Sequence, residues 1–506
     1  MKKAIAVFFL LILLLTAAFG CKKVRTEDNY YHSSSSYKLP TSSKKADLHG
    51  YSYHALLRRG CIAVSATQEE KMFYGVIDAA TDRVLFPAMY GKVEMIGDFF
   101  LLSPAESDED GVYRVAYLDG TLLTETTAEP TVADIGGGYA TVTTGAYMRI
   151  YHKSGAEILA ENILGNAYEC TACENFILAR HTVNGDYQVF NILTGENVLS
   201  LYPPSSAIMN VYYAGGNDFI VVYDYDSTQE DDYSIALLLS EGNVAYLRQR
   251  ILRMTVGVPT PHTLSCEEYV FSLKNKYSFG MTEEEREAYP VNAGYFTLGF
   301  YTRSAEGAAD GSVFYALTDK DLKIKAELPD GIRPDNPVID GYLISGKQAS
   351  SVYLLDENLK VVFSLSDANY QSVSFSDGMV VLAKIEDGRA KYGAYTTMGQ
   401  LAIGFDYAYL SKFAGGKAAA VRAGKIYIVD KEGNETYVAE TEEVSAFYVW
   451  EGFYERPELG RIGISSFDGT PLVPANYASL EAVARNGDVL YLAMRMENVV
   501  EVYILR

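Results

Sequence analysis

The sequence predicts an all-β protein, organised as a β-propeller-type repeat array of about twelve short antiparallel units. Stretches of alternating apolar and polar residues end at glycine turns, as between Tyr392–Tyr395 and Leu401–Ile403. This pattern is typical of antiparallel strands. The arrangement returns after Ala418–Val421, which is followed by a turn at Gly424. A unit that recurs along the whole chain indicates a repeat architecture rather than one compact core.

A recurring mark delimits the units: a turn ending in Gly, Asp or Asn, followed by four or five mostly apolar residues. The marks stand at Gly60, Asp98, Gly138, Asn175, Asp218, Gly294, Gly341, Gly378, Gly416, Gly452 and Asp488, with a weaker copy at Glu268. The intervals between them are 38, 40, 37, 43, 50, 26, 47, 37, 38, 36 and 36 residues. Chance spacing of strands would not hold most intervals so close to one value.

Each mark is followed by a second strand, a further turn and a third strand, which is the proportion of a propeller blade. The second strand often opens with tyrosine, at Tyr74, Tyr113, Tyr147, Tyr187, Tyr233, Tyr277 and Tyr392. The following turn closes on Gly120, Gly155, Gly195, Gly242, Gly399, Gly433 or Gly469. We expect a positive φ at these glycines, because tight hairpins need one and only glycine adopts it cheaply.

Twelve units predict two rings, since propellers usually have 4–8 blades. One irregular region, Phe279–Pro290, interrupts the array. Within it Met281–Tyr289 is predicted to form a short helix, capped by Thr282 and Glu285 and ended by Pro290. We therefore expect a first propeller-like domain over residues 51–275 and a second over residues 276–506.

The two ends of the array are expected to meet. Val489–Met494 and Val499–Leu505 form the last strands, and Tyr51–Leu57 precedes the first mark without belonging to a complete unit. Unpaired edge strands invite aggregation. The sequence therefore predicts that Tyr51–Leu57 lies in the same sheet as Val499–Leu505.

The N-terminus has the form of a secretory signal. Lys2 and Lys3 precede the apolar run Ala4–Ala18, and Gly20 stands before Cys21. This segment resembles a bacterial lipoprotein signal, which implies that residues 1–20 are removed and that Cys21 carries a diacylglycerol. An ordinary secretion signal, or an uncleaved membrane span of about 20 apolar residues, is the alternative. The serine-rich, charged residues 21–50 are predicted to be a flexible tether.

The composition limits the possible partners. The formal net charge of the chain is -22, and loss of Lys2 and Lys3 with the signal leaves 41 basic against 65 acidic residues, or -24. Such a body repels phosphate backbones, so nucleic-acid binding is not expected. The expected partners are a lipid bilayer, through the acyl chains on Cys21, and an unidentified protein or glycan.

The repeat resembles the bacterial WG-repeat family. The best copies are Tyr74-Gly75-Val76-Ile77-Asp78 and Lys391-Tyr392-Gly393-Ala394-Tyr395, with Phe413, Gly416 and Ala418 matching the second half of the unit. Tyrosine replaces the tryptophan that names the family. The resemblance implies propeller-like β repeats, and since many members have no assigned activity, it implies no substrate.

Two kinds of candidate site have structural explanations. Cys170 and Cys173 form a C-x-x-C pair, which fits a structural thiol pair or a disulfide better than a redox or metal site, because neither a helix start nor further ligands accompany it. The acidic runs Asp108–Asp110 and Asp224–Asp232 could hold calcium. They lack the twelve-residue loop pattern, so solvated hairpin loops are the default expectation.

No motif predicts a catalytic, cofactor-binding or metal site, and no cofactor is expected. Ser466–Thr470 is similar to the turn boxes of sialidase propellers, and Asn191–Gly195 to quinoprotein-type repeats. We expect a membrane-anchored, extracytoplasmic lipoprotein that binds or scaffolds protein, peptide or glycan partners, rather than an enzyme. The alternatives are an extracellular propeller hydrolase acting on glycans and a purely structural envelope component.

The lipidation of Cys21 is directly testable. Metabolic labelling with a fatty acid should tag the wild-type protein and leave Cys21→Ala unlabelled, because the thiol is the acyl acceptor. Equal labelling of the two proteins would contradict the prediction.

Overall fold

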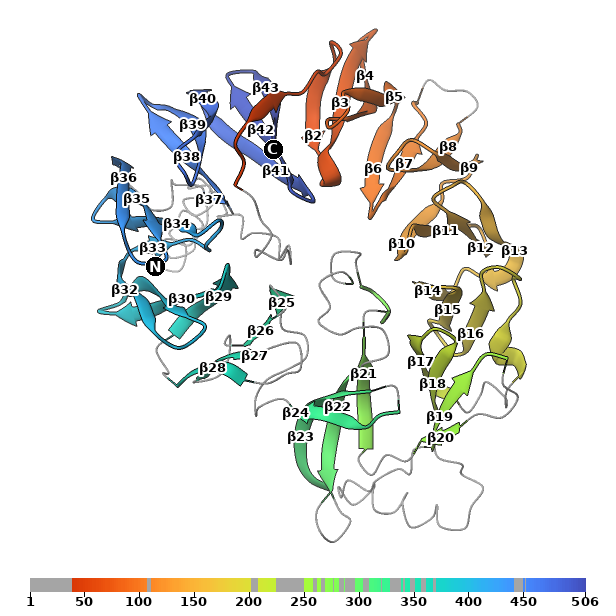
Figure 1. Cartoon of the computed structure of the whole chain (residues 1–506). Coiled ribbons are helices and arrows are strands. Elements are labelled where there is room, and N and C mark those ends of the chain that lie inside the picture. The colour runs from red at the N-terminus through yellow and green to blue at the C-terminus, as the bar shows by residue number, and fades with distance from the viewer. Residues whose placement is uncertain are drawn as a thin grey trace, which may run out of the picture.

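The computed structural model describes residues 39–506 except 107–110, 202–207, 224–249, 258–261, 265–268, 276, 282–285, 287–295, 304–308, 320, 328–337, 340–341, 346–350, 356–360, 367–369, 441–448 and 451. In this part of the chain the strands form eleven small antiparallel sheets, ten of them four-stranded. The prediction of an all-β, propeller-type array is confirmed. Figure 1 shows the sheets following one another around a single circuit, with the first strand of each sheet nearest the centre.

Five sheets follow one another from Ser52 onward, each with its strands in chain order. They comprise β2 (Ser52–Leu56), β3 (Cys61–Gln68), β4 (Lys71–Asp78) and β5 (Arg83–Tyr90); β6 (Lys92–Ile96), β7 (Phe99–Ser103), β8 (Tyr113–Tyr117) and β9 (Leu122–Thr126); β10 (Thr131–Gly136), β11 (Tyr139–Thr144), β12 (Tyr147–His152) and β13 (Glu157–Gly165); β14 (Tyr168–Cys173), β15 (Phe176–His181) and β16 (Tyr187–Asn191); and β17 (Ile208–Gly215), β18 (Asp218–Tyr223), β19 (Arg250–Thr255) and β20 (His262–Leu264). Two short 3-10 helices, η2 (Arg58–Gly60) and η3 (Val198–Leu201), lie between strands.

The next five sheets comprise β21 (Tyr269–Lys274), β22 (Phe296–Arg303), β23 (Ala309–Thr318) and β24 (Ile324–Glu327); β25 (Val338–Ile339), β26 (Tyr342–Ser345), β27 (Ser351–Leu355) and β28 (Val361–Ser366); β29 (Tyr370–Ser376), β30 (Met379–Glu386), β31 (Arg389–Thr396) and β32 (Leu401–Tyr407); β33 (Tyr409–Leu410), β34 (Lys417–Arg422), β35 (Lys425–Asp430) and β36 (Glu435–Glu440); and β37 (Val449–Trp450), β38 (Phe453–Glu458), β39 (Arg461–Ser466) and β40 (Pro471–Tyr477). The last sheet joins β41 (Ser479–Asn486), β42 (Val489–Met496) and β43 (Val499–Leu505) to β1 (Ser43–Lys45).

The repeat marks of the sequence identify the second strand of each sheet. Asp98 precedes β7, Gly378 precedes β30 and Asp488 precedes β42, and the other strong marks fall in the same place. The weak mark at Glu268 is the exception, because it precedes β21, the first strand of the sheet whose second strand follows Gly294. The described chain thus has eleven sheets where twelve units are predicted.

The predicted two-ring arrangement is not confirmed. The predicted boundary between residues 275 and 276 falls between β21 and β22, two neighbouring strands of one sheet. The helix predicted for Met281–Tyr289 lies outside the described residues except for Met281 and Arg286, and Arg286 has helical conformation.

Several turns between third and fourth strands contain a glycine with positive φ. At Gly399 the amide donates to Thr396 O at 3.0 Å, and Thr396 N donates to Gln400 O at 2.9 Å. Gly399 takes a φ of 81°, and positive φ is likewise present at Gly120, Gly155, Gly195, Gly433 and Gly469. The prediction of positive φ is confirmed at these glycines, while Gly242 lies outside the described residues.

A different constraint explains the glycine that follows tyrosine in the best repeat copies. A Cβ at Gly393 would lie 2.8 Å from Ile403 O, and one at Gly75 would lie 2.5 Å from Phe86 O. Gly463, which follows isoleucine, has the same relation to Val473 O at 2.6 Å. In all three sheets the fourth strand crosses the third so closely that only glycine leaves room for its backbone.

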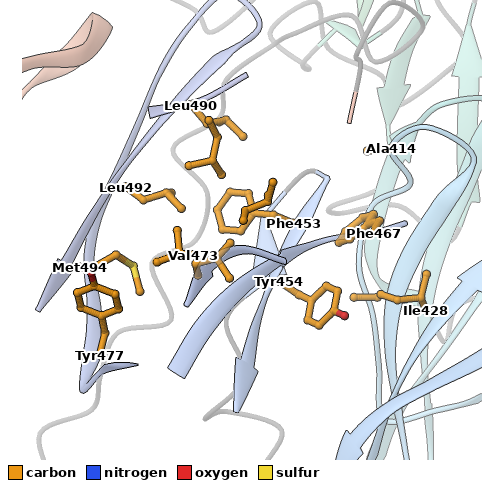
Figure 2. Packing of buried hydrophobic residues seen from close by; sticks show 14 residues of the cluster. Ala414, Ile428, Phe453, Tyr454, Phe467, Val473, Tyr477, Leu490, Leu492 and Met494 are labelled. Atoms are coloured by element: carbon orange, nitrogen blue, oxygen red, sulfur yellow. The ribbon is translucent and has the colours of Figure 1, made fainter. Parts of the chain in front are cut away.

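Neighbouring sheets pack face to face through buried apolar side chains. In Figure 2, Leu490, Leu492 and Met494 of β42 lie toward Phe453 and Val473 of the preceding sheet. Tyr454 and Phe467, on the other side of that sheet, lie toward Ile428 of β35. Each sheet therefore buries apolar side chains against the sheet on either side of it. This burial supplies most of the stability of the fold, at about 25 cal/mol per Å² of apolar surface removed from water.

Tyrosines at the ends of fourth strands tie adjacent sheets together at their outer edges. Tyr477 of β40 donates its hydroxyl to Glu501 Oε2 at 2.6 Å in the next sheet. Tyr407 of β32 hydrogen-bonds Glu435 of β36. Arg422 pairs with the same Glu435 at 2.6 Å and lies over the Tyr407 ring at 5.3 Å. Since buried hydroxyls need partners, many of the 41 tyrosines have structural roles.

The N-terminal strand β1 closes the ring, and the predicted closing segment is wrong. Ser43 pairs with Leu505 and Lys45 with Tyr503 of β43. Tyr51–Leu57 instead contributes β2, the first strand of the next sheet. The misassignment arises because Ser43–Lys45 is short, polar and exposed, which the sequence presents as part of the tether. Folded structure therefore begins inside the predicted tether of residues 21–50.

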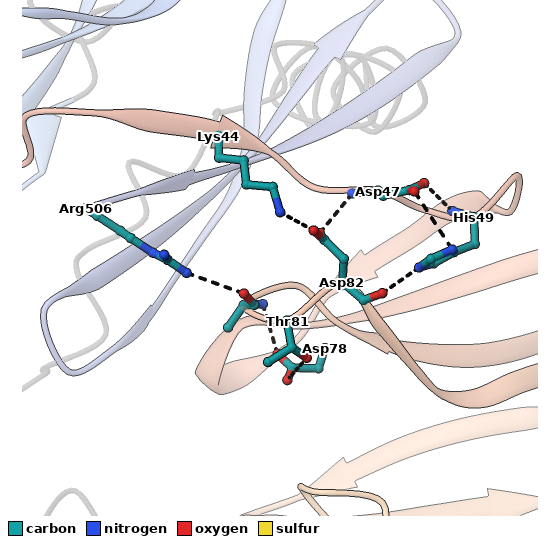
Figure 3. A network of polar contacts seen from close by, with 8 residues as sticks. Lys44, Asp47, His49, Asp78, Thr81, Asp82 and Arg506 are labelled. Carbon is teal, nitrogen blue, oxygen red and sulfur yellow. Dashed lines mark hydrogen bonds and ion pairs between the residues drawn. The ribbon is translucent and has the colours of Figure 1, made fainter.

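Polar contacts hold this strap, defined here as residues 39–49, against the first sheet. Lys44 pairs with Asp82, whose Oδ1 also accepts the Asp47 amide at 3.1 Å (Figure 3). Asp47 accepts the His49 amide at 2.8 Å, and Arg506 reaches Ala80 O at 3.4 Å. Among the described residues no helix has the length and apolar character that crossing a bilayer requires.

Replacement of Gly393 tests the close crossing of strands. Gly393→Ala should lower Tm clearly, because the new Cβ meets backbone that cannot move without breaking the β31–β32 pairing. Gly404→Ala, in the same sheet, is the control, since its Cβ would meet only the carboxylate end of Asp406 at 3.2 Å. Equal Tm values for the two variants would contradict the crossing.

The strap gives a pH-dependent contribution to stability. Burial acts to raise the pKa of Asp82, but the Lys44 hydrogen bond, the Asp47 amide and the nearby cations outweigh it, so the pKa is lowered. A lowered folded-state pKa stabilises the fold above the unfolded pKa of about 4, and this stability is lost as pH falls through the folded value.

Asp82→Asn should therefore lower Tm slightly at pH 7. The loss in the free energy of unfolding should be less than about 1 kcal/mol, because exposed ion pairs are weak. The Tm difference from wild type should disappear as the pH falls toward 3. A difference that persists unchanged at low pH would exclude the Asp82 carboxylate as its source.

Candidate functional site

A cavity lies at the inner rim of the ring, between the sheet β10–β13 and the sheet β14–β16. Its volume is about 740 Å³, within the range of small-molecule sites. Apolar, hydroxyl, amide and charged groups share its lining, which comprises Arg58, Ile96, Gly97, Glu129, Thr131, Val132, Ala133, Asp134, Ile135, Thr141, Thr143, Gly145, Met148, Asn166, Tyr168, Glu169, Cys170, Gly280, Met281 and Arg286.

Strand periodicity explains most of this lining. Thr141 and Thr143 of β11 are two residues apart and so face the same side of their sheet. Tyr168 and Cys170 of β14 do the same on the opposite wall. The two neighbouring sheets therefore present a threonine face and a tyrosine–cysteine face to one space.

The remaining wall comes from a segment distant in sequence. Gly280, Met281 and Arg286 follow β21, the first strand of a sheet two positions further round the ring. Arg286 lies so near Gly136 that a Cβ at that glycine would come within 2.9 Å of Arg286 Nε. Gly136, at the end of β10, thus makes room for the guanidinium.

Two of the three carboxylates that line the cavity have structural partners. Asp134 Oδ2 accepts the Asp98 amide at 2.9 Å, and Asp134 Oδ1 accepts the Gly136 amide at 2.9 Å. Glu169 Oε2 receives a hydrogen bond from Arg180 at 2.7 Å. Glu129 is exposed to solvent. The site can hydrogen-bond a polar ligand, but its carboxylates are not arranged as a free acid–base pair.

A second cavity, of about 310 Å³, lies on the other side of β14, and Glu169 lines both. The residues that follow β21 form one wall of it. Tyr277 donates its hydroxyl to Glu174 Oε1 at 2.9 Å, and Tyr213 donates to Glu174 Oε2 at 2.6 Å. Burial first, and then the hydrogen bond to Glu174, raise the pKa of both tyrosines well above the ordinary value. Both hydroxyls therefore remain protonated donors.

The same segment is fixed by two further contacts. Asn275 Nδ2 donates to Tyr213 O at 2.6 Å, and the Arg180 guanidinium lies 5.0 Å from the centre of the Phe279 ring. Tyr277 and Phe279 also pack against the apolar cluster between β14–β16 and β17–β20. The residues after β21 therefore brace two earlier sheets and line both cavities.

Cys170 and Cys173 do not form a disulfide. They are three residues apart on β14, so their side chains point to opposite faces of the sheet and pack into different apolar clusters. Both are free thiols, as is Cys61. Burial, and then the charge of Glu169, raise the pKa of Cys170 to about 12, and burial raises that of Cys173 further.

The other sequence candidates have local roles or lie outside the described residues. The acidic runs Asp108–Asp110 and Asp224–Asp232 lie outside them, as does Cys21. In the described part of the chain, no group of three or more His, Cys, Asp and Glu side chains gathers as a metal site would. Ser466–Thr470 is the turn between β39 and β40, where Asp468 Oδ1 accepts the Thr470 amide at 2.9 Å.

Asn191 forms a similar turn after β16 and accepts the Leu193 amide at 2.9 Å. His152 and His181 also serve turns. His152 Nδ1 lies 2.8 Å from Ser154 Oγ, and His181 Nδ1 accepts the Val183 and Asn184 amides, both at 3.2 Å.

The cavity residues carry no signature in the sequence. They come from η2, the sheets β6–β9, β10–β13 and β14–β16, and the segment after β21, and each alone reads as an ordinary strand or turn residue. The one available signal is the irregular spacing around Glu268. It marks the place where the chain departs from the repeat, and the segment that lines the cavity begins there.

Comparison with known proteins gives no family. No family model matches the chain, and no curated protein matches it. Solved structures match at low identity. The crystal structure of a eukaryotic initiation factor is 12% identical, covering 72% of this chain and 87% of its own, with a TM-score of 0.34.

Two further structures are similar in the same way. Apo AztD from Citrobacter koseri is 12% identical, covering 68% of this chain and 94% of its own, with a TM-score of 0.26. Hsv2p from Kluyveromyces lactis is 9% identical, covering 68% and 97%, with a TM-score of 0.22. These likenesses are too distant to bear on function.

Thiol reactivity tests the assignment of the cysteines. At pH 8 the thiolate is the reactive form, and a raised pKa keeps Cys61 and Cys170 protonated. Alkylation with iodoacetamide, followed by peptide mass spectrometry, should be slow at Cys61, Cys170 and Cys173 in the folded protein and fast after unfolding. Rapid modification of Cys170 in the folded protein would support a redox role instead.

Proposed function

We propose that this protein is a membrane-anchored extracytoplasmic lipoprotein whose β-ring acts as a binding module for a protein, peptide or glycan. The N-terminal signal and Cys21 support the anchor, and the 740 Å³ cavity at the inner rim supports the binding role. The cavity is the single observation that carries the proposal.

The chemistry of the cavity favours a polar, uncharged or zwitterionic group. Thr131, Thr143 and Asn166 offer hydroxyl and amide groups, and Tyr168 adds an aromatic face. Hydroxyls and amides of this kind bond the hydroxyls of sugars or the backbone of peptides, and aromatic faces suit sugar rings and apolar side chains. Arg58 and Arg286 place positive charge at a site in an otherwise strongly acidic chain.

A glycan hydrolase is less well supported by the same cavity. Hydrolysis requires one carboxylic acid and one carboxylate about the scissile bond. Asp134 accepts two backbone amides and Glu169 receives the Arg180 hydrogen bond, so two of the three lining carboxylates, all but the exposed Glu129, are held by the fold. Binding without turnover is the function that these contacts favour.

A thermal-shift screen of cell-wall glycans and peptides tests the proposal. A ligand of the cavity should raise the Tm of the wild-type protein, because it stabilises only the folded state. Thr131→Tyr places a larger side chain at the cavity lining and should abolish the shift. Thr436→Tyr, which also replaces an exposed strand threonine but lies on β36, is the matched control and should keep it.

Loss of the shift in both variants, or in neither, would contradict binding at this cavity. Release of product from the same glycans by the wild-type protein would replace the binding proposal with the hydrolase.

A further inference from the structure

The two ends of each sheet carry different numbers of turns. In an antiparallel sheet whose strands follow in order, the first–second and third–fourth turns share one end, and the second–third turn lies at the other. The two turns at the shared end are hydrogen-bonded to each other. Leu118 N donates to Asp98 O at 3.1 Å, Lys153 N to Gly138 O at 2.7 Å and Phe467 N to Gly452 O at 3.0 Å.

Neighbouring sheets are joined at this same end. The Asp98 amide donates to Asp134 of the next sheet at 2.9 Å, and the Gly416 amide donates to Asp377 of the preceding sheet at 2.6 Å. Asn486, beside the first turn of the last sheet, reaches Arg59 O of η2 at 3.4 Å. The ends with two turns therefore lie together on one side of the ring, the paired-turn face, and the second–third turns lie on the opposite, single-turn face.

The strap joins the ring at the paired-turn face. Ser43 pairs with Leu505, at the end of β43 away from the β42–β43 turn. Just before it, the Thr41 and Ser42 amides donate to Arg506 O at 2.8 and 3.1 Å. Leu39 lies against Gly415, in the first turn of the sheet β33–β36, so closely that a Cβ there would come within 2.7 Å of Leu39 Cγ.

We propose that the anchored protein lies with its paired-turn face toward the membrane and its single-turn face outward. The inference rests on the proposed lipid anchor at Cys21 and adds which surface of the ring meets the lipid. The strap determines the arrangement, because it fixes the point at which the chain from the anchor reaches the ring.

The length of chain before the strap supports this orientation. Seventeen residues, Lys22 to Lys38, separate Cys21 from Leu39. A flexible chain of that length has a mean end-to-end distance of roughly 20–25 Å. The eight-residue strand β3 makes the ring about 26 Å high, at ~3.3 Å per residue. To turn the single-turn face to the bilayer, the connecting chain would have to run along the full height of the ring. That path takes up the whole mean reach of the chain and restricts its conformations, which costs entropy.

The cavity reaches both faces of the ring, since Gly97, in the β6–β7 turn, lines it at the paired-turn end. Gly145, in the β11–β12 turn, and Asn166, before β14, line the cavity at the single-turn end of their sheets. A partner that approaches from outside the membrane would meet this end of the cavity first.

Four exposed turn residues make matched probes of the two faces. Leu193 and Met398 lie in turns of the paired-turn face and are 87% and 80% exposed. Val183 and Leu459 lie in second–third turns of the single-turn face and are 84% and 99% exposed. Leu193 and Val183 belong to the sheet β14–β16, while Met398 and Leu459 come from sheets on the other side of the ring (Figure 1).

The experiment replaces each probe residue by cysteine in a Cys266→Ser background, leaving Cys61, Cys170 and Cys173, which are buried. Lipidated protein in phosphatidylethanolamine–phosphatidylglycerol vesicles is treated with a maleimide that carries a long polyethylene glycol chain. The labelling rate is compared with that of the same variant in a soluble form that starts at Lys22 and so lacks both the apolar signal and Cys21. We expect Leu193→Cys and Met398→Cys to lose labelling several-fold on anchoring, and Val183→Cys and Leu459→Cys to keep their rates.

Other outcomes overturn the proposal in distinguishable ways. Slowing at Val183→Cys and Leu459→Cys, or equal rates at all four positions, would show that the anchored ring does not present the paired-turn face to the bilayer. Slowing at only one of Leu193→Cys and Met398→Cys would show a ring tilted on its edge. Failure of the protein to associate with vesicles would overturn the anchor itself, and the orientation with it.

Discussion

The pairing of β1 with β43 is the interaction on which the ring depends. A meander of sheets that stops short of closure exposes the two faces on either side of the gap, and these faces carry the apolar residues that every other sheet buries against its neighbours. Residues from the two ends of the chain remove this gap. Tyr491 of β42 packs against Gly60 so tightly that a Cβ at the glycine would come within 2.2 Å of its ring. The three residue pairs of β1 and the contacts of Lys44 and Asp82 then complete the last sheet and tie it to the first.

The contacts between neighbouring sheets are of three simple kinds. Sheets are held together by apolar side chains in their interiors, by turn-to-turn hydrogen bonds on one face and by tyrosine hydroxyls at their outer edges. These contacts need only a small residue where two backbones cross and an aromatic residue where two sheets meet. A tyrosine-rich, tryptophan-poor chain with one Trp and 41 Tyr can therefore build a large ring.

The sheet β21–β24 departs from this pattern, and the departure creates the candidate site. In the other sheets with a described first turn, a short turn joins the first and second strands, whereas here residues 275–295 intervene. Tyr277 and Phe279 brace two earlier sheets, and the next described residues line the 740 Å³ cavity. Because the brace is fixed by Glu174 and Tyr213, the cavity wall is set by contacts between sheets and not by the repeat itself.

The sequence by itself determined the features that depend on local chemistry. Strand periodicity and turn glycines follow from backbone sterics within a few residues, so the all-β repeat, the second strand of each sheet and the positive φ at Gly399 could all be predicted. Tertiary structure alone decided the number of sheets, the closing strand and the site. Ser43–Lys45 has no apolar pattern and becomes a strand only because β43 offers it an edge, while Tyr168 and Met281 share a cavity only because the ring brings their sheets together. Such contacts depend on the closure of the whole chain, and no local pattern records them.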